Sequence, residues 1–166
     1  MQRLILMRHA EAVGSAPSGL DRDRALSPRG RIEAQSVGRA LAARGLQPDL
    51  ALVSAATRTR QTWDLLRESL GEIALRAEHA LYNAPAETLR VHAERAGQDA
   101  DCVILIAHNP GVHQLAMDLL TEADARPAGA SRMAGGFPTA AVAVFAIDAE
   151  GRPSFEDGFD PSDLSE

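Results

Sequence analysis

The 166-residue sequence predicts an α/β fold, namely a three-layer α/β/α sandwich with a mainly parallel central sheet. Two observations support this prediction. Short apolar runs without helical periodicity alternate along the chain with amphipathic segments of helical length, which is typical of a parallel sheet covered by helices. In addition, 45% of the residues are apolar, enough for one core in a chain too short for two ordinary domains. We therefore expect a single domain over residues 1–156.

The first strand and the first helix are predicted from a short apolar run and a helix-start signal. Residues 3–7 form an apolar run bounded by polar residues, as expected of a buried parallel strand. The Gly, Pro, Ser and Asp residues of segment 12–27 indicate an irregular loop. Ser27 then has the character of an N-cap and Pro28 that of the first helical residue. A helix is predicted from here to about Arg44.

The second strand and helix follow the same pattern. Residues 50–53 form another apolar run, which is followed by Ser54. A helix is predicted over residues 57–70, because apolar side chains recur there every three or four positions. Gly71 is expected to end this helix.

The strongest strand signal lies later in the chain, at residues 102–107, an unbroken apolar run that precedes His108. Asn109 is expected to cap the helix that follows. From Asp157 onward the chain is acidic and poor in apolar residues, so residues 157–166 are predicted to be a loose tail. The same signals predict the remaining elements, which are a strand at 73–76, a helix from Pro85 to Ala96, a loop at 129–138 and a strand at 139–147.

The charge pattern restricts the partners. A net charge of −6 argues against nucleic acid, because binding to its backbone requires an excess of Lys and Arg. The charge is uneven, however: residues 1–67 hold 11 Arg and 6 acidic residues, and the remainder holds 6 Arg and 17 acidic residues. The first part could therefore bind an anion.

Targeting signals and cysteine content restrict the compartment. No segment approaches the roughly 20 apolar residues of a membrane span, and the N-terminus lacks the layout of a secretory signal. We expect a cytoplasmic protein that does not contact membranes and is a monomer or a weak dimer. The single cysteine, Cys102, is expected to be a buried core thiol.

Histidine and arginine residues follow three of the predicted strands. Arg8 and His9 come after the first, Arg58 soon after the second, and His108 after the run at 102–107. Ligands of α/β sheets collect outside the carboxyl ends of the strands, so these side chains are expected in one crevice. Arginine offers a planar fork of donors that matches phosphoryl oxygens. A neutral imidazole can attack phosphorus when its other ring nitrogen is hydrogen-bonded. The pattern therefore predicts phosphoryl transfer, with His9 as the nucleophile.

Three motifs in this order resemble the histidine phosphatase superfamily. They are Arg8-His9-Ala10, the segment 54–62 that contains Arg58, and His108-Asn109-Pro110. The resemblance spans about residues 2–147. Ala10, the segment 26–30 and the segment 137–139 further resemble the SixA-type phosphohistidine phosphatases.

The resemblance implies a phosphoglycerate mutase-like fold and a phosphatase that needs neither a metal ion nor an organic cofactor. It also implies that His9 is phosphorylated during the reaction and that Arg8, Arg58 and His108 form the phosphate pocket.

The general acid stays open at this point. Family members often place a Glu at a position where this chain offers Glu87, whereas the SixA type resembles a pattern with an Asp in the loop after the first strand. That loop offers Asp21 and Asp23, and Asp21 is preferred over Glu87. An imidazole leaving group is protonated more readily than an alkoxide, so a weakly defined acid favours phosphohistidine as the substrate.

Several alternatives remain. The substrate could be a phosphorylated protein or a small phosphate monoester, and the chain could also be an idle phosphate-binding module. A metallohydrolase is disfavoured, because no His-Glu-x-x-His or similar ligand spacing occurs. Four further residues could touch the substrate, and the sequence does not decide whether they do: His113, Arg22, Arg24 and Arg60.

Overall fold

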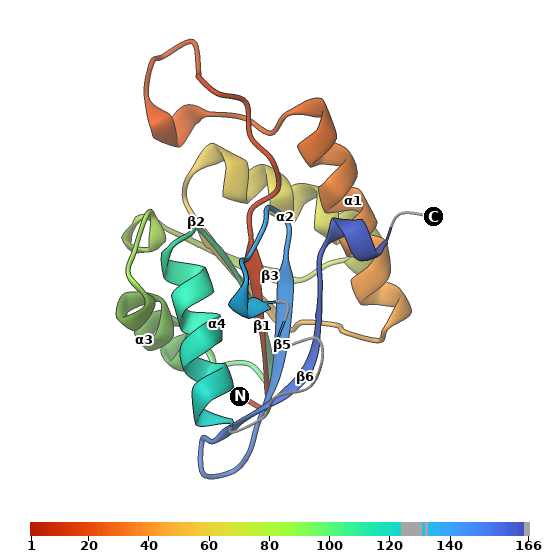
Figure 1. The fold of residues 1–166 in the computed structure, drawn as a ribbon, viewed down its shortest axis with the longest axis vertical. Coiled ribbons are helices and arrows are strands. Elements are labelled where there is room, and N and C mark those ends of the chain that lie inside the picture. The colour runs from red at the N-terminus through yellow and green to blue at the C-terminus, as the bar shows by residue number, and fades with distance from the viewer. Residues whose placement is uncertain (124–130, 132, 165–166) are drawn as a thin grey trace.

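The computed structural model describes residues 1–123, 131 and 133–164. Within these residues, six strands form one sheet in the order β3-β2-β4-β1-β5-β6, and four α-helices cover it (Figure 1). The strands are β1 (Arg3–Arg8), β2 (Leu50–Ser54), β3 (Ala74–Glu78), β4 (Cys102–Ala107), β5 (Val142–Ile147) and β6 (Pro153–Phe159). The helices are α1 (Pro28–Ala43), α2 (Thr57–Leu70), α3 (Ala86–Ala96) and α4 (Gly111–Glu122).

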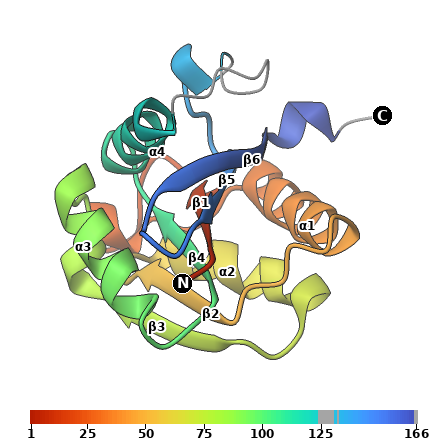
Figure 2. The same cartoon turned by 90° about the horizontal axis from the view of Figure 1, so that it is seen from below.

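The helices lie in two layers, with α1 and α2 on one face of the sheet and α3 and α4 on the other (Figure 2). Alternation along β1 explains how one strand serves both layers. Leu4 and Leu6 belong to the core under α3 and α4, whereas Ile5 and Met7 belong to the core under α1 and α2. The predicted three-layer α/β/α sandwich is confirmed.

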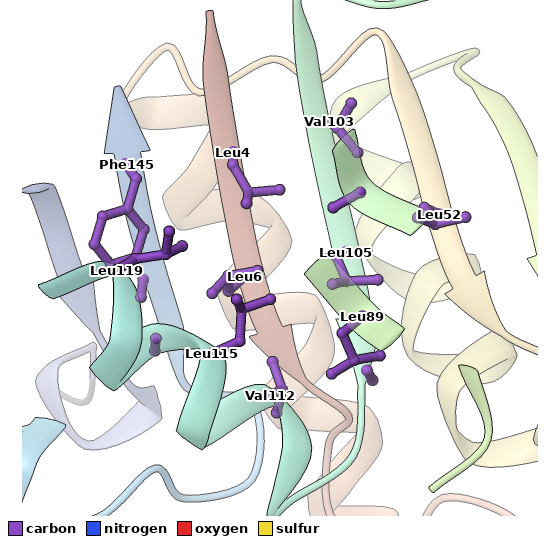
Figure 3. Packing of buried hydrophobic residues seen from close by; sticks show 14 of the residues in the cluster. Leu4, Leu6, Leu52, Leu89, Val103, Leu105, Val112, Leu115, Leu119 and Phe145 are labelled. Carbon is purple, nitrogen blue, oxygen red and sulfur yellow. The ribbon is translucent and has the colours of Figure 1, made fainter. Parts of the chain in front are cut away.

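The core beneath α4 is made mainly of aliphatic side chains from neighbouring strands and helices, with the ring of Phe145 among them (Figure 3). Leu6 of β1 and Leu105 of β4 are fully buried there, as is Leu89 of α3. Leu115 of α4 is 1% exposed. Burying each such side chain stabilises the fold by about 1.5–3 kcal/mol, so this layer holds β1 and β4 side by side.

Strand pairing brings three strand ends together. The β1–β4, β2–β4 and β2–β3 pairs are parallel, whereas β5 and β6 join antiparallel to one edge. In this register Arg8 lies opposite Ala107 and Val53 lies opposite Ile106. The residues that follow β1, β2 and β4 therefore lie at the same edge of the sheet. Figure 1 shows the long loop after β1 at this end of the molecule, opposite the N-terminus.

The predicted loose tail is wrong over residues 157–164. Asp157 and Phe159 pair with β5 as part of β6, and the buried Phe159 ring carries the Arg44 guanidinium 4.0 Å from its centroid. Asp160 then caps a short 3-10 helix, η3 (Pro161–Asp163). An edge strand tolerates proline and acidic residues, so its composition resembles that of a loop. Residues 165 and 166 lie outside the described part of the chain.

Three smaller predictions also need correction. β5 begins at Val142, because Thr139 and Ala140 form a turn. Asn109 does not cap α4, since its Nδ2 donates to the Phe137 carbonyl and Pro110 occupies the N-cap position. The predicted loop at 129–138 contains helical residues at 131, 133 and 134, and residues 129, 130 and 132 lie outside the described residues.

No helix among the described residues is long and apolar enough to cross a membrane.

Candidate active site

His9 lies directly after β1 and is 7% exposed. Its Nδ1 is 2.8 Å from the carbonyl oxygen of Ala10. A carbonyl only accepts, so Nδ1 carries the hydrogen and Nε2 keeps a lone pair when the ring is neutral. Burial is the main cause that lowers the pKa of His9 from 6.5 to about 4, and the charges of Arg58 and Arg8 lower it further. The ring is therefore neutral near pH 7, with Nε2 available as a nucleophile.

The chain after His9 is held against α1 and α2. The Ala10 amide donates to Thr62 Oγ1 at 3.0 Å, and the Glu11 amide donates to the buried carboxylate of Glu33 at 3.0 Å. Gly30 allows the closest approach, because a Cβ atom at this position would lie 1.9 Å from the Glu11 carbonyl oxygen. These contacts fix the backbone on which the His9 ring is mounted.

The loop that follows is closed at its base. Ala12 and Leu26 form an isolated antiparallel bridge, and the Val13 amide donates to the Ala25 carbonyl at 2.9 Å. The loop between them carries a short 3-10 helix, η1 (Asp21–Asp23), which lies over the site.

Arg58 lies in the first turn of α2 and is 4% exposed. Its Nε donates to His9 Nε2 at 3.3 Å. Its Nη1 donates to the backbone carbonyl of Asp21 at 3.0 Å, and its Nη2 donates to the Asp21 carboxylate at 3.2 Å. The short turn from β2 to α2 thus places a guanidinium directly beside the lone pair of His9.

Arg8 is the last residue of β1, and its side chain contacts the segment that precedes β5. Its Nη1 donates to the Phe137 carbonyl at 3.3 Å, while its buried Nε has no hydrogen-bond partner among the described residues. Burial and the neighbouring Arg58 charge lower the pKa of Arg8, and the Glu33 carboxylate opposes this shift. Arg8 therefore contributes a second positive charge and an unpaired donor.

His108 follows β4 and is 2% exposed. Its ring centroid lies 5.3 Å from that of His9. Nε2 is 2.7 Å from Ser54 Oγ, and the buried Nδ1 has no partner in the described part of the chain. Burial is the largest cause that lowers the pKa of His108 to about 3, with further contributions from His9 and Arg58. This ring is also neutral near pH 7.

Asp21 contacts the site directly, but its environment opposes the general-acid role that the sequence suggests. The carboxylate accepts hydrogen bonds from the Tyr82 hydroxyl, from Arg24 Nη1 at 2.9 Å and from Arg58 Nη2 at 3.2 Å. These bonds, led by that of Tyr82, hold the pKa of Asp21 well below its usual range. An acid of this strength is ionised near neutral pH.

Glu87, the other candidate acid, lies exposed in the first turn of α3. Within the described residues, no hydrogen bond or ion pair joins it to the His9 cluster. Arg22 and Arg60 are likewise exposed. Asp23, on η1, accepts from the Ser18 hydroxyl at 2.7 Å.

Two of the remaining candidates lie nearer to the site. Arg24 reaches it through Asp21. His113 stacks on the Phe137 ring with centroids 6.0 Å apart. A cavity of about 660 Å³ lies beside Arg8 and is lined in part by His113, Phe137 and Asp160.

Sequence reasoning assigned no role to Tyr82. Its ring meets His108 edge-on at 5.5 Å and lies 5.9 Å from the Arg58 guanidinium carbon, while its hydroxyl donates to Asp21. Tyr82 follows β3 and η2 (His79–Leu81), so it comes from a fourth strand end at the same edge of the sheet. Its position after a predicted strand, together with its being the single tyrosine, is the signal that could have found it.

The arrangement suits an anionic group that reacts with a nucleophile. Arg8 Nε and His108 Nδ1 are buried without partners among the described residues, and the charges of Arg8 and Arg58 act on both histidines. Unpaired buried polar atoms are costly unless a ligand pairs with them, so such atoms mark a binding site. Within the described residues, no three His, Cys, Asp or Glu side chains are placed to hold a metal ion.

The comparisons with known proteins agree with this chemistry. The model of the histidine phosphatase superfamily (branch 1) matches residues 4–85. An uncharacterized protein of Mycobacterium tuberculosis is 35% identical over 142 residues, which cover 85% of this chain and 87% of the relative.

Two solved structures add to this. SixA of Agrobacterium tumefaciens, assigned as a phosphohistidine phosphatase, has a TM-score of 0.82 and 30% identity, with 95% of this chain and 97% of that chain covered. A mycobacterial glucosyl-3-phosphoglycerate phosphatase complexed with VO3 has a TM-score of 0.65 and 22% identity, with 94% and 97% covered. At 22% identity the second likeness shows the fold alone.

Proposed function

This chain belongs to the histidine phosphatase superfamily, in its SixA-type branch, and on that premise we propose that it removes the phosphoryl group from phosphohistidine in a protein. It is a histidine phosphatase that acts without a metal ion. The proposal concerns the substrate, the residues that act on it and the cytoplasm as the place of action.

In the first step, the lone pair of His9 Nε2 attacks phosphorus. A bond forms between Nε2 and phosphorus, the P–N bond of the substrate breaks, and the leaving imidazole takes a proton from solvent water. In the second step, water attacks phospho-His9, the new P–N bond breaks and phosphate leaves. Arg8, Arg58 and His108 donate hydrogen bonds to the phosphoryl oxygens and balance the charge that develops in both steps.

The observation that supports this mechanism best is the hydrogen bond between His9 Nδ1 and the Ala10 carbonyl. It fixes the tautomer in which Nε2 carries the lone pair, and Arg58 Nε lies against that same nitrogen. A nucleophile held by a second group in this way is the general pattern of covalent catalysis.

The surroundings of Asp21 favour phosphohistidine over a phosphate monoester. A monoester releases an alkoxide, which requires a strong proton donor, whereas an imidazole accepts a proton readily near neutral pH. Asp21, which contacts Arg58 beside His9, is ionised by its hydrogen bonds with Tyr82, Arg24 and Arg58. The SixA relative at 30% identity supports the same choice. Small phosphate monoesters remain the alternative substrates, and the next experiment distinguishes the two.

The test compares kcat/KM for a phosphohistidine-bearing phosphotransfer domain with kcat/KM for a panel of phosphate monoesters. We expect a clear preference for the phosphohistidine protein. A preference for the monoesters would overturn the substrate assignment. Rapid quenching with 32P-labelled substrate should in addition trap an acid-labile phosphoenzyme. His79→Ala, at an exposed histidine of η2, is the matched control and should be labelled as the natural protein is. His9→Ala should not be labelled.

A further inference from the structure

Ser54 is the last residue of β2 and is fully buried at the edge of the sheet that carries the candidate site. Its Oγ lies 2.7 Å from His108 Nε2. Its backbone carbonyl accepts a hydrogen bond from Thr59 Oγ1 at 2.7 Å, so the first turn of α2 holds Ser54 in place. The serine thus connects the end of β2 to the histidine that follows β4.

The proton between Ser54 and His108 can be assigned by counting partners. Besides His108 Nε2, Ser54 Oγ contacts the Ala56 amide at 3.4 Å, and an amide can only donate. The hydroxyl hydrogen therefore has one acceptor in the described part of the chain, which is His108 Nε2. If Ser54 donates to Nε2, then Nδ1 of the neutral ring carries the other hydrogen.

The opposite assignment leaves more polar atoms unpaired. If Nε2 of His108 donated to Ser54, the buried hydroxyl hydrogen would have no acceptor, and the Nδ1 lone pair would also be unpaired. With Ser54 as the donor, only the Nδ1 hydrogen lacks a partner within the part of the chain that the structure describes. Each unsatisfied buried group costs about 1–3 kcal/mol, so the tautomer with hydrogen on Nδ1 is favoured.

We propose that Ser54 is a positioning residue that fixes His108 in the tautomer with hydrogen on Nδ1, so that this N–H donates to the transferred phosphoryl group. The proposal rests on the proposed function above, because it assumes that a phosphoryl group occupies the space beside His9. Ser54 itself does not touch the phosphoryl group in this proposal; it acts by orienting the hydrogen of His108. In the other tautomer, Nδ1 would present a lone pair to the phosphoryl oxygens and repel them.

Ser54→Ala removes the hydroxyl and should shift the His108 ring toward the tautomer with hydrogen on Nε2. We expect kcat to fall by about 10-fold to 100-fold, which is less than the roughly 100-fold to 1,000-fold cost of removing an oxyanion donor altogether. Inhibition by tungstate, a tetrahedral oxyanion, should weaken in parallel. Ser54→Thr keeps the hydroxyl and should restore most of the activity. Ser154→Ala, at an exposed position of β6, is the matched control and should leave kcat unchanged.

The decisive comparison repeats Ser54→Ala in a His108→Ala background. If Ser54 acts through His108, the second substitution should add no further loss of kcat. An equal loss in both backgrounds would overturn the proposal.

Nitrogen-15 NMR of the histidine rings of the natural protein provides a test that needs no Ser54 variant to fold. It should show hydrogen on Nδ1 of His108, with the signal assigned by its absence in His108→Ala. Hydrogen on Nε2 would overturn the proposal. These spectra do not depend on turnover. A failure of the proposed function, such as turnover that persists in His9→Ala, is therefore distinguishable from a failure of this inference.

Discussion

The carboxyl ends of β1 and β4 present the same side chain in opposite ways. Each strand is followed directly by a buried neutral histidine, and contacts favour hydrogen on Nδ1 in both rings. At His9 the Ala10 carbonyl accepts from Nδ1, so the lone pair is at Nε2, where Arg58 Nε donates to it at 3.3 Å. At His108 the protein occupies Nε2 with Ser54, which leaves a hydrogen at Nδ1. In the proposed mechanism, the partner of the ring nitrogen that fixes each tautomer makes one ring a nucleophile and the other a donor.

The largest expected effect comes from removing the nucleophile. His9→Gln keeps a polar side chain of similar length but has no nitrogen lone pair that can attack, so turnover should fall by at least about 10,000-fold. His108→Gln should cost less, about 100-fold to 1,000-fold, because it removes a donor. Single-turnover rates with a phosphohistidine protein check both. Equal losses in the two variants would remove the functional distinction between the strand ends.

The charge of Arg58 lowers the pKa of both histidines, so replacing Arg58 tests how far both rings depend on it. Arg58→Lys keeps the positive charge but loses the fork of donors, and we expect kcat/KM to fall by about 100-fold to 1,000-fold. Arg58→Ala also removes the charge that helps to lower the pKa of His9 and of His108, so both values should rise. Titration of the ring protons by NMR checks this. Unchanged pKa values in Arg58→Ala would show that burial alone keeps the rings neutral.

Stability should depend on pH through both rings. Their folded pKa values, about 4 and about 3, lie below the ordinary 6.5, so below pH 6.5 the unfolded chain binds protons that the folded chain does not. The stabilisation is complete above pH 6.5 and is lost as the pH falls toward these values. Each histidine should lower the free energy of unfolding by about 2 kcal/mol as the pH falls from 6.5 to 5. Urea unfolding measures this, and replacing either histidine with Gln should reduce the slope. A free energy of unfolding that stayed constant from pH 7 to pH 5 would contradict the shifts.

Two glycines support the two strand ends separately and give the smallest effects. An added Cβ would lie 1.9 Å from the Glu11 carbonyl oxygen at Gly30, behind His9, and 2.0 Å from the Ala84 carbonyl oxygen at Gly111, behind His108. We expect Gly30→Ala and Gly111→Ala each to lower the free energy of unfolding by about 1–3 kcal/mol. Gly14→Ala is the control, because no heavy atom lies within 4 Å of its added Cβ. Thermal and urea unfolding measure all three, and a neutral Gly30→Ala would mean that the loop after β1 relaxes freely.

Much of the fold could be predicted because its main elements follow local rules. The helix predicted at 57–70 is α2 with the same bounds, since its apolar periodicity and Gly71 define it locally. β6 could not be predicted in this way. Its residues, which include Pro153 and Gly158, do not have the composition of a strand. The strand forms because its backbone pairs with β5, and that pairing is not visible in the local sequence.

The candidate site also contains residues that could be predicted from the sequence and features that could not. Arg8, His9, Arg58 and His108 could be named because each directly follows a recognisable strand or begins the next helix, and sheet geometry brings such positions together. The state of Asp21 could not be foreseen, because it depends on Tyr82, which is 61 residues away in sequence. Ser54 could be predicted as the end of a strand, but its proposed effect on the His108 tautomer depends on the distance between the two side chains, which the sequence does not contain.

The bridge between Ala12 and Leu26 has a consequence for how substrate range could change. Because this bridge and the Val13–Ala25 hydrogen bond close the loop at its base, we expect changes in length and sequence between them to leave the backbone of His9 in place. Lengthening a loop costs little, about 0.6 kcal/mol for each doubling. We therefore expect this segment to be exchangeable as a unit. Transplanting it from a relative with another substrate should transfer recognition while the phosphorylation chemistry stays with the sheet.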